Sequence, residues 1–477
     1  MVKRALTCIL LPLLGIPSCA PVGPNYSTPD NPVPDFWNTG LQANMDTSTP
    51  DIEAWWRKFN DPTLNKLISL AESQNRDLAI AAERVEEARA QRGISRGALF
   101  PTLGAGGGGS RNRSSESLPF MPPNPINIYD TGLSSGWETD FVGGLRRSVE
   151  ASSASLEATQ EVYHDTMVII YADVASNYIS YRTLQRRISL AQSNIAAQKK
   201  SVQITKDRKT AGLAPQIDVS QAETNLATSQ ALIPQLQGGL SATLNNLAVL
   251  VGRYPGSIGG MLRGSTKIPT PRESLSIGLP ANLLRSRPDI RAAERTLAAQ
   301  TASIGVAQAE LYPKFGLSGT FSLQSTSSGN LVDTDSRAYS FGPSFQWHIF
   351  EGGRIRESIK VEESRTRQAL ANYEKTVLQA VAEVESSLAS IKYEKRRNQF
   401  LDKSVTSAKE TASLIVDNYT EGLVDFQNVL DAQRTVFDRE DSAAASSGQF
   451  AINHVSLYRS LGGGTKMPKQ PVLNDKP

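Results

Sequence analysis

Two long runs without glycine or proline constrain the fold of this chain more than any other feature. Residues 145–211 contain neither residue type, and residues 354–421 show the same absence. Both runs are rich in Ala, Glu, Gln, Arg and Lys, which favour helix. At 1.5 Å per residue, a helix through either run would be roughly 100 Å long, far beyond the usual globular range. The sequence therefore predicts two very long helices.

The second run carries the pattern of a coiled coil. Its apolar residues recur every three or four positions, an average of about 3.5 that is typical of helices packed along their length. Glycines at 212 and 422 follow the runs, as glycine does at many helix C-termini. A second helix is expected after each, at about 215–251 and 426–461. Each half is thus predicted to contain a long antiparallel helical hairpin. The seam comprises Leu370, Tyr373, Val377, Val381, Val384, Leu388 and Ile391.

The two hairpins belong to a duplicated sequence. Asp77 recurs as Asp289, an offset of 212 (289 − 77), and Trp137 recurs as Trp347, an offset of 210 (347 − 137). Landmarks in the same order at a nearly constant offset indicate two copies of one unit. Further matched pairs are Leu99 with Leu311, Phe141 with Phe350, Gly212 with Gly422, and Gly252 with Gly462.

The duplication suggests a division of the chain into six parts. We expect a signal peptide at 1–18, a lipid-anchored N-terminal segment at 19–60, a first repeat at 61–252, a linker at 253–280, a second repeat at 281–464 and a tail at 465–477. Each repeat is predicted to contain a helix, a β-hairpin and a long helical hairpin.

Four segments between the helices alternate apolar and polar side chains. The pattern is clear at 311–323 and 341–349, and weaker at 99–109 and 129–141. Such segments are typical of membrane-spanning barrel strands. Four strands cannot close a barrel, because about eight is the practical minimum, and open edges are not viable in lipid. The sequence therefore predicts an oligomer whose protomers share one barrel.

Aromatic residues near the strand ends support the membrane interpretation. Trp137, Phe141, Trp347 and Phe350 are expected at the membrane interface, where aromatic girdles flank such barrels. The alternative is a soluble protein with two exposed β-hairpins on helical stalks. The aromatic strand ends and the export signal described next argue against that alternative.

The N-terminus has the features of a secretory signal. Lys3 and Arg4 precede an apolar stretch at 5–16, which is too short to span a bilayer as a helix. Small residues then lead into Cys19, as in a bacterial lipobox. Because acyl chains anchor a protein to lipid, a lipidated Cys19 would tether the mature chain. The alternative is an ordinary signal sequence with an incidental cysteine.

Charge and composition disfavour several other functions. The 50 basic and 47 acidic side chains nearly cancel, so no nucleic-acid partner is expected. The three histidines are scattered, and no Gly-Lys dipeptide exists to form a P-loop. Cys8 and Cys19 are the only cysteines, so no cysteine-based metal site can form in the mature body. We therefore predict a protein that is not an enzyme and has no metal or cofactor.

Several motifs together carry a family resemblance. They are residues 19–26 (CAPVGPNY), 56–62 (WRKFNDP), 287–294 (RPDIRAAE) and 430–434 (LDAQR). With these motifs the chain resembles the TolC-like outer-membrane efflux proteins, in the NodT-type lipoprotein branch that serves resistance–nodulation–division pumps. The resemblance implies a mainly helical fold with membrane β-structure: a homotrimer with a 12-stranded outer-membrane β-barrel, four strands per protomer, continued by a coiled helical tunnel in the periplasm. The implied partners are a periplasmic adaptor (membrane fusion protein), the inner-membrane pump and outer-membrane lipid.

The resemblance also implies a gate at the ends of the helical hairpins. The family aspartate that rings the periplasmic aperture corresponds to Asp431, and Tyr419 corresponds to the family's partner of that aspartate. Asp425 is a second candidate for the ring. Gln427 stands where the family often has a bulky apolar residue. The alternative for Asp431 is a simple pairing with Arg434 on one helix face.

Gly212 and Gly422 are candidate hinges or adaptor contacts at the same hairpin ends. Each could equally serve only to terminate its helix.

The expected function is an outer-membrane exit duct that passively conducts small molecules in a tripartite efflux system. Three alternatives remain at this stage: the outer component of a type I protein-secretion system, a structural lipoprotein spanning the periplasm, and a free-standing porin. The cargo is open between drugs, metals, solvents and other compounds.

Overall fold

The computed structural model describes residues 20–30, 33–34, 37–38, 52–115, 117, 125–264, 266–271 and 287–465. The expected signal peptide and Cys19 lie outside the described residues, as does 272–286. The chain forms two compact units. The sheet unit comprises Met1–Asp30, Arg84–Gln160 and Ala292–Tyr373, and the hairpin unit comprises Asn31–Glu83, Glu161–Arg291 and Glu374–Pro477.

The helices repeat in matching lengths, which agrees with the duplicated sequence. The first and second copies contain helices of 22, 67 and 35 residues in the same order. These pairs are α2 (Arg76–Gly97) with α6 (Pro288–Ala309), α3 (Gly144–Thr210) with α7 (Arg354–Thr420), and α4 (Gln216–Leu250) with α8 (Phe426–Ser460). The two very long helices and their antiparallel partners are therefore confirmed. None of the described helices has an apolar stretch long enough to cross a membrane.

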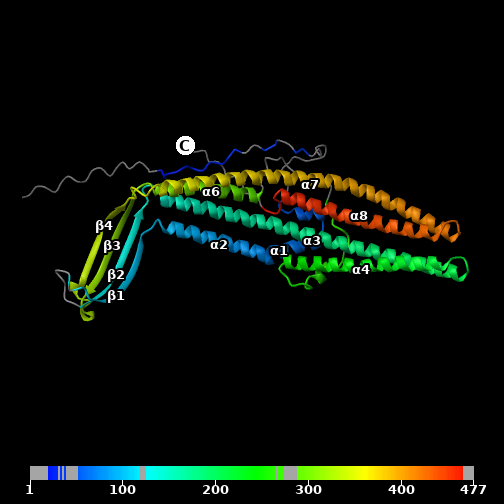
Figure 1. Ribbon diagram of the computed structural model, residues 1–477, viewed down its shortest axis with the longest axis horizontal. Helices are drawn as coiled ribbons and strands as arrows, with labels where there is room; N and C mark the ends of the chain where they lie inside the picture. Colours follow the sequence, from blue (N-terminus) through cyan, green and yellow to red (C-terminus); the bar gives the residue numbers. More distant parts are fainter. Residues whose placement is uncertain are drawn as a thin grey trace, which may run out of the picture. The chain divides into compact units, whose positions relative to one another are not determined.

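The sheet unit contains four antiparallel strands that lie side by side in chain order (Figure 1). They are β1 (Thr102–Asn112), β2 (Ile126–Thr139), β3 (Lys314–Ser325) and β4 (Arg337–Gln346). The central β2–β3 pairing joins the two sequence copies, with Leu133 opposite Phe321. Within the described residues, β1 and β4 each pair on one side only. The four predicted strands are confirmed, and the outer two leave free edges.

The sheet exposes apolar side chains in this protomer. Phe341 is 81% exposed and Phe345 is 71% exposed, which is unusual for residues of this size. A contiguous exposed apolar surface marks an interaction site or a membrane-facing site. The exposed set on the strands includes Leu133, Trp137, Phe315, Leu317, Phe321, Tyr339, Phe341 and Phe345.

The hairpin unit contains the main apolar core. A short 3-10 helix, η2 (Trp55–Phe59), and the following helix α1 (Pro62–Gln74) pack against the long helices. The ring of Trp55 is fully buried and stacks on Tyr458 of α8, with centroids 5.2 Å apart. Seam residues of α7 enter the same core, including Val384 and Leu388, both 0% exposed. The coiled-coil seam is therefore buried as predicted in this part of α7.

Candidate functional site

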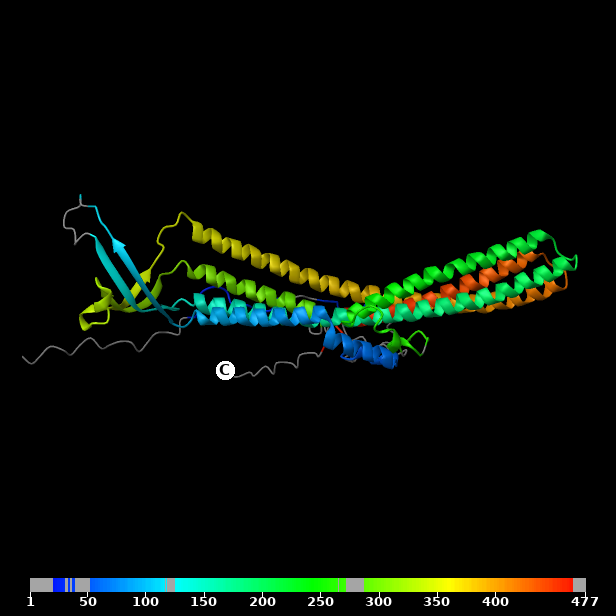
Figure 2. The same ribbon diagram turned by 90° about the horizontal axis from the view of Figure 1, so that it is seen from below.

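The two helical hairpins of the hairpin unit turn at the same end (Figure 2). In the first hairpin, the Leu213 N–H donates to the Arg208 carbonyl at 2.8 Å, and the Gly212 N–H donates to Lys209 at 2.9 Å. In the second, Leu423 donates to Asn418 at 2.9 Å and Gly422 donates to Tyr419 at 3.1 Å. Both pairs form the Schellman arrangement that ends a helix. The turns therefore have one geometry in both copies.

Gly212 and Gly422 adopt left-handed backbone conformations at these turns. Their φ angles are +77° and +80°, a region that glycine enters without steric cost. A Cβ atom added at Gly212 would meet nothing within 4 Å. Both glycines thus terminate their helices in open turns, and their role as hinges or adaptor contacts stays a prediction.

An apolar cluster lies beneath the turns and joins the two hairpins. Tyr419 is 5% exposed, and its ring packs on Phe426 with centroids 5.2 Å apart. Val202 and Ala222 of the first hairpin complete the contact. Arg208 covers the other side, with its guanidinium carbon 4.8 Å from the centroid of the Tyr419 ring. Burial, together with the charge of Asp218, raises the pKa of the Tyr419 phenol.

Asp431 lies on the exposed face of α8. Its side chain is 60% exposed and accepts hydrogen bonds from Gln427 Nε2 at 3.1 and 3.2 Å. Its nearest cation is Arg434, 3.7 Å away, whose Nε instead donates to Asn225 at 2.8 Å. Gln427 therefore donates its side-chain amide to the aspartate, at the position where the resemblance implies a bulky apolar residue. The gate role of Asp431 and Gln427 stays a prediction.

Asp425 lies at the N-terminus of α8 and faces another carboxylate across the hairpins. Its side chain makes no capping hydrogen bond. The pKa of Asp218, on the first hairpin, is raised by burial and further by the negative charge of Asp425. Arg208 opposes this shift, and it also donates from Nη1 to the Thr420 carbonyl at 3.0 Å. The turns thus gather two carboxylates around one arginine.

The sequence analysis missed Asp218 and Arg208. One signal in the sequence could have marked them. At the offset of 210, Asp218 aligns with Asn428 (428 − 218) and Arg208 with Asn418 (418 − 208). A charged residue in the first copy therefore corresponds to a neutral asparagine in the second copy at both positions. In the structure, Asp218 and Arg208 lie between the two hairpins.

Further polar contacts join the hairpins along their length. Arg187 of α3 binds Asp441 of α8 through two hydrogen bonds of 2.7 and 2.8 Å. Closer to the turns, Gln433 donates to the Ser201 hydroxyl at 2.7 Å. Charge-assisted bidentate pairs are the stronger kind of polar contact, so Arg187 and Asp441 form the firmest of these links.

The predicted interface aromatics lie where the strands meet the helices of the sheet unit. Phe141 packs edge-to-face on Phe315, with centroids 5.5 Å apart. Phe350 is 90% exposed. Trp137 and Trp347 are 40% and 50% exposed, and each donates its indole N–H to a backbone carbonyl. Their position at a membrane interface stays a prediction.

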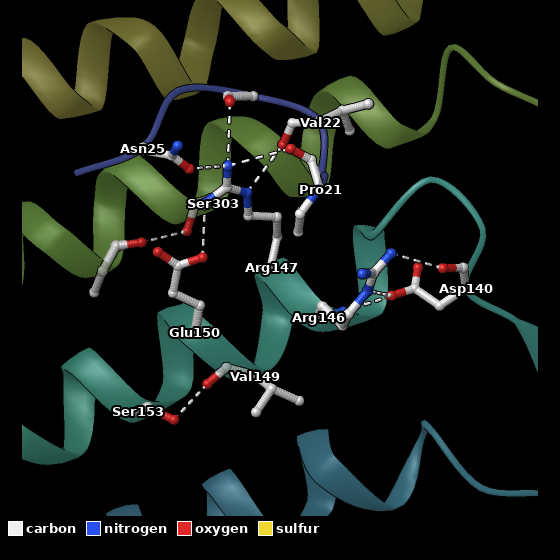
Figure 3. Close-up of polar contacts among 12 residues, drawn as sticks. Pro21, Val22, Asn25, Asp140, Arg146, Arg147, Val149, Glu150, Ser153 and Ser303 are labelled. Atoms are coloured by element: carbon white, nitrogen blue, oxygen red, sulfur yellow. Dashed lines mark hydrogen bonds and ion pairs between the residues drawn. The ribbon is translucent and has the colours of Figure 1, made fainter. Parts of the chain in front are cut away.

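Among the described residues, no group of three or more His, Cys, Asp or Glu side chains is arranged so that it could hold a metal ion. The segment that follows Cys19 is described from Ala20 onward, and Arg147 of α3 binds it (Figure 3).

Comparison with known proteins assigns the family. The model of the outer membrane efflux protein family matches residues 67–253 and 279–463. These two matched segments correspond to the two sequence copies, which confirms the internal repeat.

Individual relatives extend over nearly the whole chain. Nodulation protein T of Rhizobium leguminosarum bv. trifolii is 32% identical over 93% of this chain and 94% of the relative. The solvent efflux pump outer membrane protein SrpC of Pseudomonas putida is 30% identical over 95% of this chain and 97% of the relative.

Solved structures agree with these sequence matches. The outer-membrane channel OprN superposes with a TM-score of 0.86 and 34% identity, covering 93% of this chain and 99% of the channel. The open-state MtrE outer membrane channel of Neisseria gonorrhoeae gives a TM-score of 0.81 and 28% identity over 93% and 98% of the chains. The chain therefore belongs to the outer membrane efflux protein family, as its motifs predicted.

Proposed function

We propose that three copies of this chain form a passive exit duct in the outer membrane, the last component of a tripartite efflux system. The observation that carries this proposal is the four-stranded sheet with free edges at β1 and β4 and exposed apolar side chains. Such edges are not viable in lipid unless they pair. Edge-to-edge pairing of three sheets gives the closed 12-stranded barrel expected from the family.

The helical hairpins form the periplasmic tunnel in this account. Asp431 and Asp425 line its narrow end, where three copies of each would favour cations and oppose anions. Tyr419 and Phe426 support the ring from beneath, because they pack the second hairpin onto the first. Opening then requires the hairpin ends to separate.

The remaining parts of the proposal concern anchoring and partners. An acylated Cys19 tethers each protomer to outer-membrane lipid. A periplasmic adaptor contacts the open turns at Gly212 and Gly422, and an inner-membrane resistance–nodulation–division pump supplies the energy. The duct itself performs no catalysis and holds no cofactor or metal.

Crosslinking in cells, followed by purification of the oligomer and mass spectrometry, tests the partners. We expect a trimer together with an adaptor and a proton-driven inner-membrane pump. Recovery of an ATP-driven exporter would instead move the function to protein secretion. A trimer with no periplasmic partner under crosslinking conditions that capture other envelope complexes would contradict the tripartite assignment.

Single-channel conductance tests the gate. The Asp431→Ala variant should raise the conductance and admit vancomycin into cells, because three carboxylates at the aperture are removed. Asp438→Ala, an exposed aspartate on the same helix, is the matched control and should behave as the wild type. Equal conductance in all three proteins would refute the gate assignment.

A further inference from the structure

The N-terminal segment lies across the beginning of α3 and is bound there by one buried arginine (Figure 3). The Arg147 side chain is 3% exposed. Its Nε donates to the Val22 carbonyl at 3.0 Å, and its Nη2 donates to the Gly23 carbonyl at 3.1 Å and to Asn25 Oδ1 at 2.7 Å. A longer contact of 3.4 Å reaches the Pro21 carbonyl. One guanidinium therefore contacts four residues of the segment, Pro21, Val22, Gly23 and Asn25.

Charge compensation comes from α3 itself. The Arg147 Nη1 donates to Glu150 Oε2 at 2.7 Å, so the buried cation is paired. The backbone adds a further bond, because the Val22 N–H donates to the Val142 carbonyl at 3.0 Å. A buried charge with this many partners is a built binding site and not an incidental surface contact.

Glycines in the N-terminal segment and in the unit beneath it let the two backbones approach within contact distance. Gly23 has φ +93°, and a Cβ atom there would lie 2.5 Å from the Cα of Gly305 on α6. A Cβ at Gly143, which has φ +87°, would lie 2.5 Å from the Cα of Pro21. No real side chain tolerates such distances. The surface around Arg147, Gly143 and Gly305 is therefore complementary to this segment and has no space for a side chain at Gly23 or Gly143.

The far end of the segment is held separately. Tyr26 donates its hydroxyl to Glu294 at 3.0 Å, and Arg295 lies 5.4 Å from the centroid of the tyrosine ring. Burial and the Glu294 charge raise the pKa of Tyr26 to about 12. Residues 21–26 are thus bound along their whole length.

This binding surface lies where the sheet meets the helices of the sheet unit. Gly143 follows β2 and precedes α3, and its neighbours Val142 and Gly144 line a cavity of about 150 Å³. The apolar part of that lining also includes Phe141, Leu145, Val306 and Pro313. Because consecutive Cα atoms are about 3.8 Å apart, Cys19 can be no more than about 8 Å from Pro21. Pro21, two residues after Cys19, itself lies against Gly143 at this junction.

We propose that Arg147 and its surrounding glycines are a docking site for residues 21–26, and that this docking fixes where the acyl chains of Cys19 leave the protein. The acyl chains then emerge at the junction of sheet and helices, beside the cavity at Val142. This inference rests on the proposed lipidation of Cys19. It makes Arg147 a positioning residue for the membrane anchor.

Chymotrypsin tests the docking directly, because Tyr26 is its only aromatic target between Cys19 and Asp30. Cleavage after Tyr26 releases an N-terminal peptide that mass spectrometry follows. Proteolysis of a transiently released segment tracks the population of the released form. Loss of several charge-assisted hydrogen bonds in Arg147→Ala should therefore speed release about tenfold or more.

Two further variants control this experiment. Arg146→Ala removes the adjacent arginine, whose guanidinium binds Asp140 at 3.1 Å, and it should leave the release rate unchanged. Gly23→Ala lies within the segment, so it cannot unfold the helices, yet it should speed release as Arg147→Ala does. Equal release rates in the wild type, Arg147→Ala and Gly23→Ala trimers would overturn the docking proposal.

A photoreactive palmitate analogue fed to the cells tests the anchor position. In the wild type and Arg146→Ala we expect crosslinks from the labelled chain to Phe141, Val142 or Pro313. In Arg147→Ala the yield of crosslinks to these residues should fall, because the released segment no longer places the chain beside them. An unchanged crosslink pattern would overturn the positioning role. An intact mass of the wild-type protein that shows no acyl groups would refute the lipidation. The chymotrypsin experiment would still test the docking of residues 21–26, and the proposed efflux function would be unaffected.

Discussion

The indole Nε1 of Trp137 donates a hydrogen bond of 2.9 Å to the backbone carbonyl of Leu99. Trp347 makes the equivalent bond of 3.0 Å to Leu311 in the second copy. Leu99 and Leu311 lie just before the first strand of each β-hairpin, and the tryptophans lie at or just after the end of the second strand. Each β-hairpin is therefore closed at its base by the same bond, which belongs to the repeated unit.

Replacing either tryptophan by phenylalanine should remove this bond and keep most of the aromatic surface. Trp137→Phe and Trp347→Phe should each lower the stability of the protein by about 1 kcal/mol, the typical net value of one hydrogen bond. Thermal dissociation of the purified oligomer measures the effect. Because the two bonds are equivalent, a change in only one variant would contradict the shared role.

Gly448 of α8 lies in tight contact with Thr183 of α3. A Cβ atom at Gly448 would approach Thr183 Oγ1 to 2.1 Å and Cγ2 to 2.9 Å. Gly448→Ala should therefore destabilise the hairpin unit by about 1–3 kcal/mol, as overpacking does. Adding Thr183→Ala should restore much of the loss. Gly238→Ala, where a Cβ meets nothing within 4 Å, is the control. A failure of the double variant to recover would show that the contact is not the cause.

The Arg187–Asp441 pair should couple the hairpins measurably. Both side chains are partly exposed, at 29% and 21%, so solvent screens the pair. A double-mutant cycle with Arg187→Met and Asp441→Asn should give a coupling of about 1 kcal/mol, at the upper end for such pairs. Thermal dissociation at low and high salt measures it, and the coupling should fall with salt. Strict additivity of the two single variants would contradict this prediction.

Asp165 should make stability depend on pH. Burial, and then the charge of Asp289, raise its pKa to about 6. Other charged groups facing it are Arg287, Arg459 and Glu383. An acid whose pKa is higher in the folded state stabilises the fold while it is protonated. This contribution is complete below about pH 4, the unfolded pKa, and is lost as the pH rises through about 6.

Asp165→Asn isolates this effect. Relative to the wild type, the variant should gain stability between pH 4 and pH 7, by about 1–2 kcal/mol after allowance for partial exposure. Burial lowers the pKa of His454, so the contribution of His454 to stability rises with pH, opposite to that of Asp165. Because both proteins contain His454, its contribution cancels in the difference between them. The thermal midpoint measured at each pH checks the prediction. A constant difference across this range would refute it.

The long helices and strands could be predicted because their signals are local. The runs without glycine or proline match α3 and α7 nearly residue for residue, and Gly212 and Gly422 fall at their ends. The alternation at 311–323 gave β3. The signal was weak for β1, because its run of glycines has few side chains to alternate. Pro234 lies inside α4 and does not end it.

The contacts between distant segments could not be predicted in the same way. Arg147 and the N-terminal segment lie more than a hundred positions apart in the sequence, so no periodicity relates them. The same holds for Arg208 and Thr420, which join the hairpin ends. The family motif points to Asp431, whereas the hydrogen bond that Asp431 accepts from Gln427 becomes visible only in the helix, where the two residues are one turn apart. Burial and charge at these sites depend on packing that the local pattern does not contain.

Conductance of the purified oligomer in planar bilayers tests the central claim most directly. We predict that the wild type inserts into the bilayer, has a small single-channel conductance and is closed most of the time. Combined Asp425→Ala and Asp431→Ala substitutions should increase the conductance of the open channel and reduce its preference for cations. Inserted trimers without any conductance, in the wild type and in the double variant alike, would contradict the account of this chain as an efflux duct.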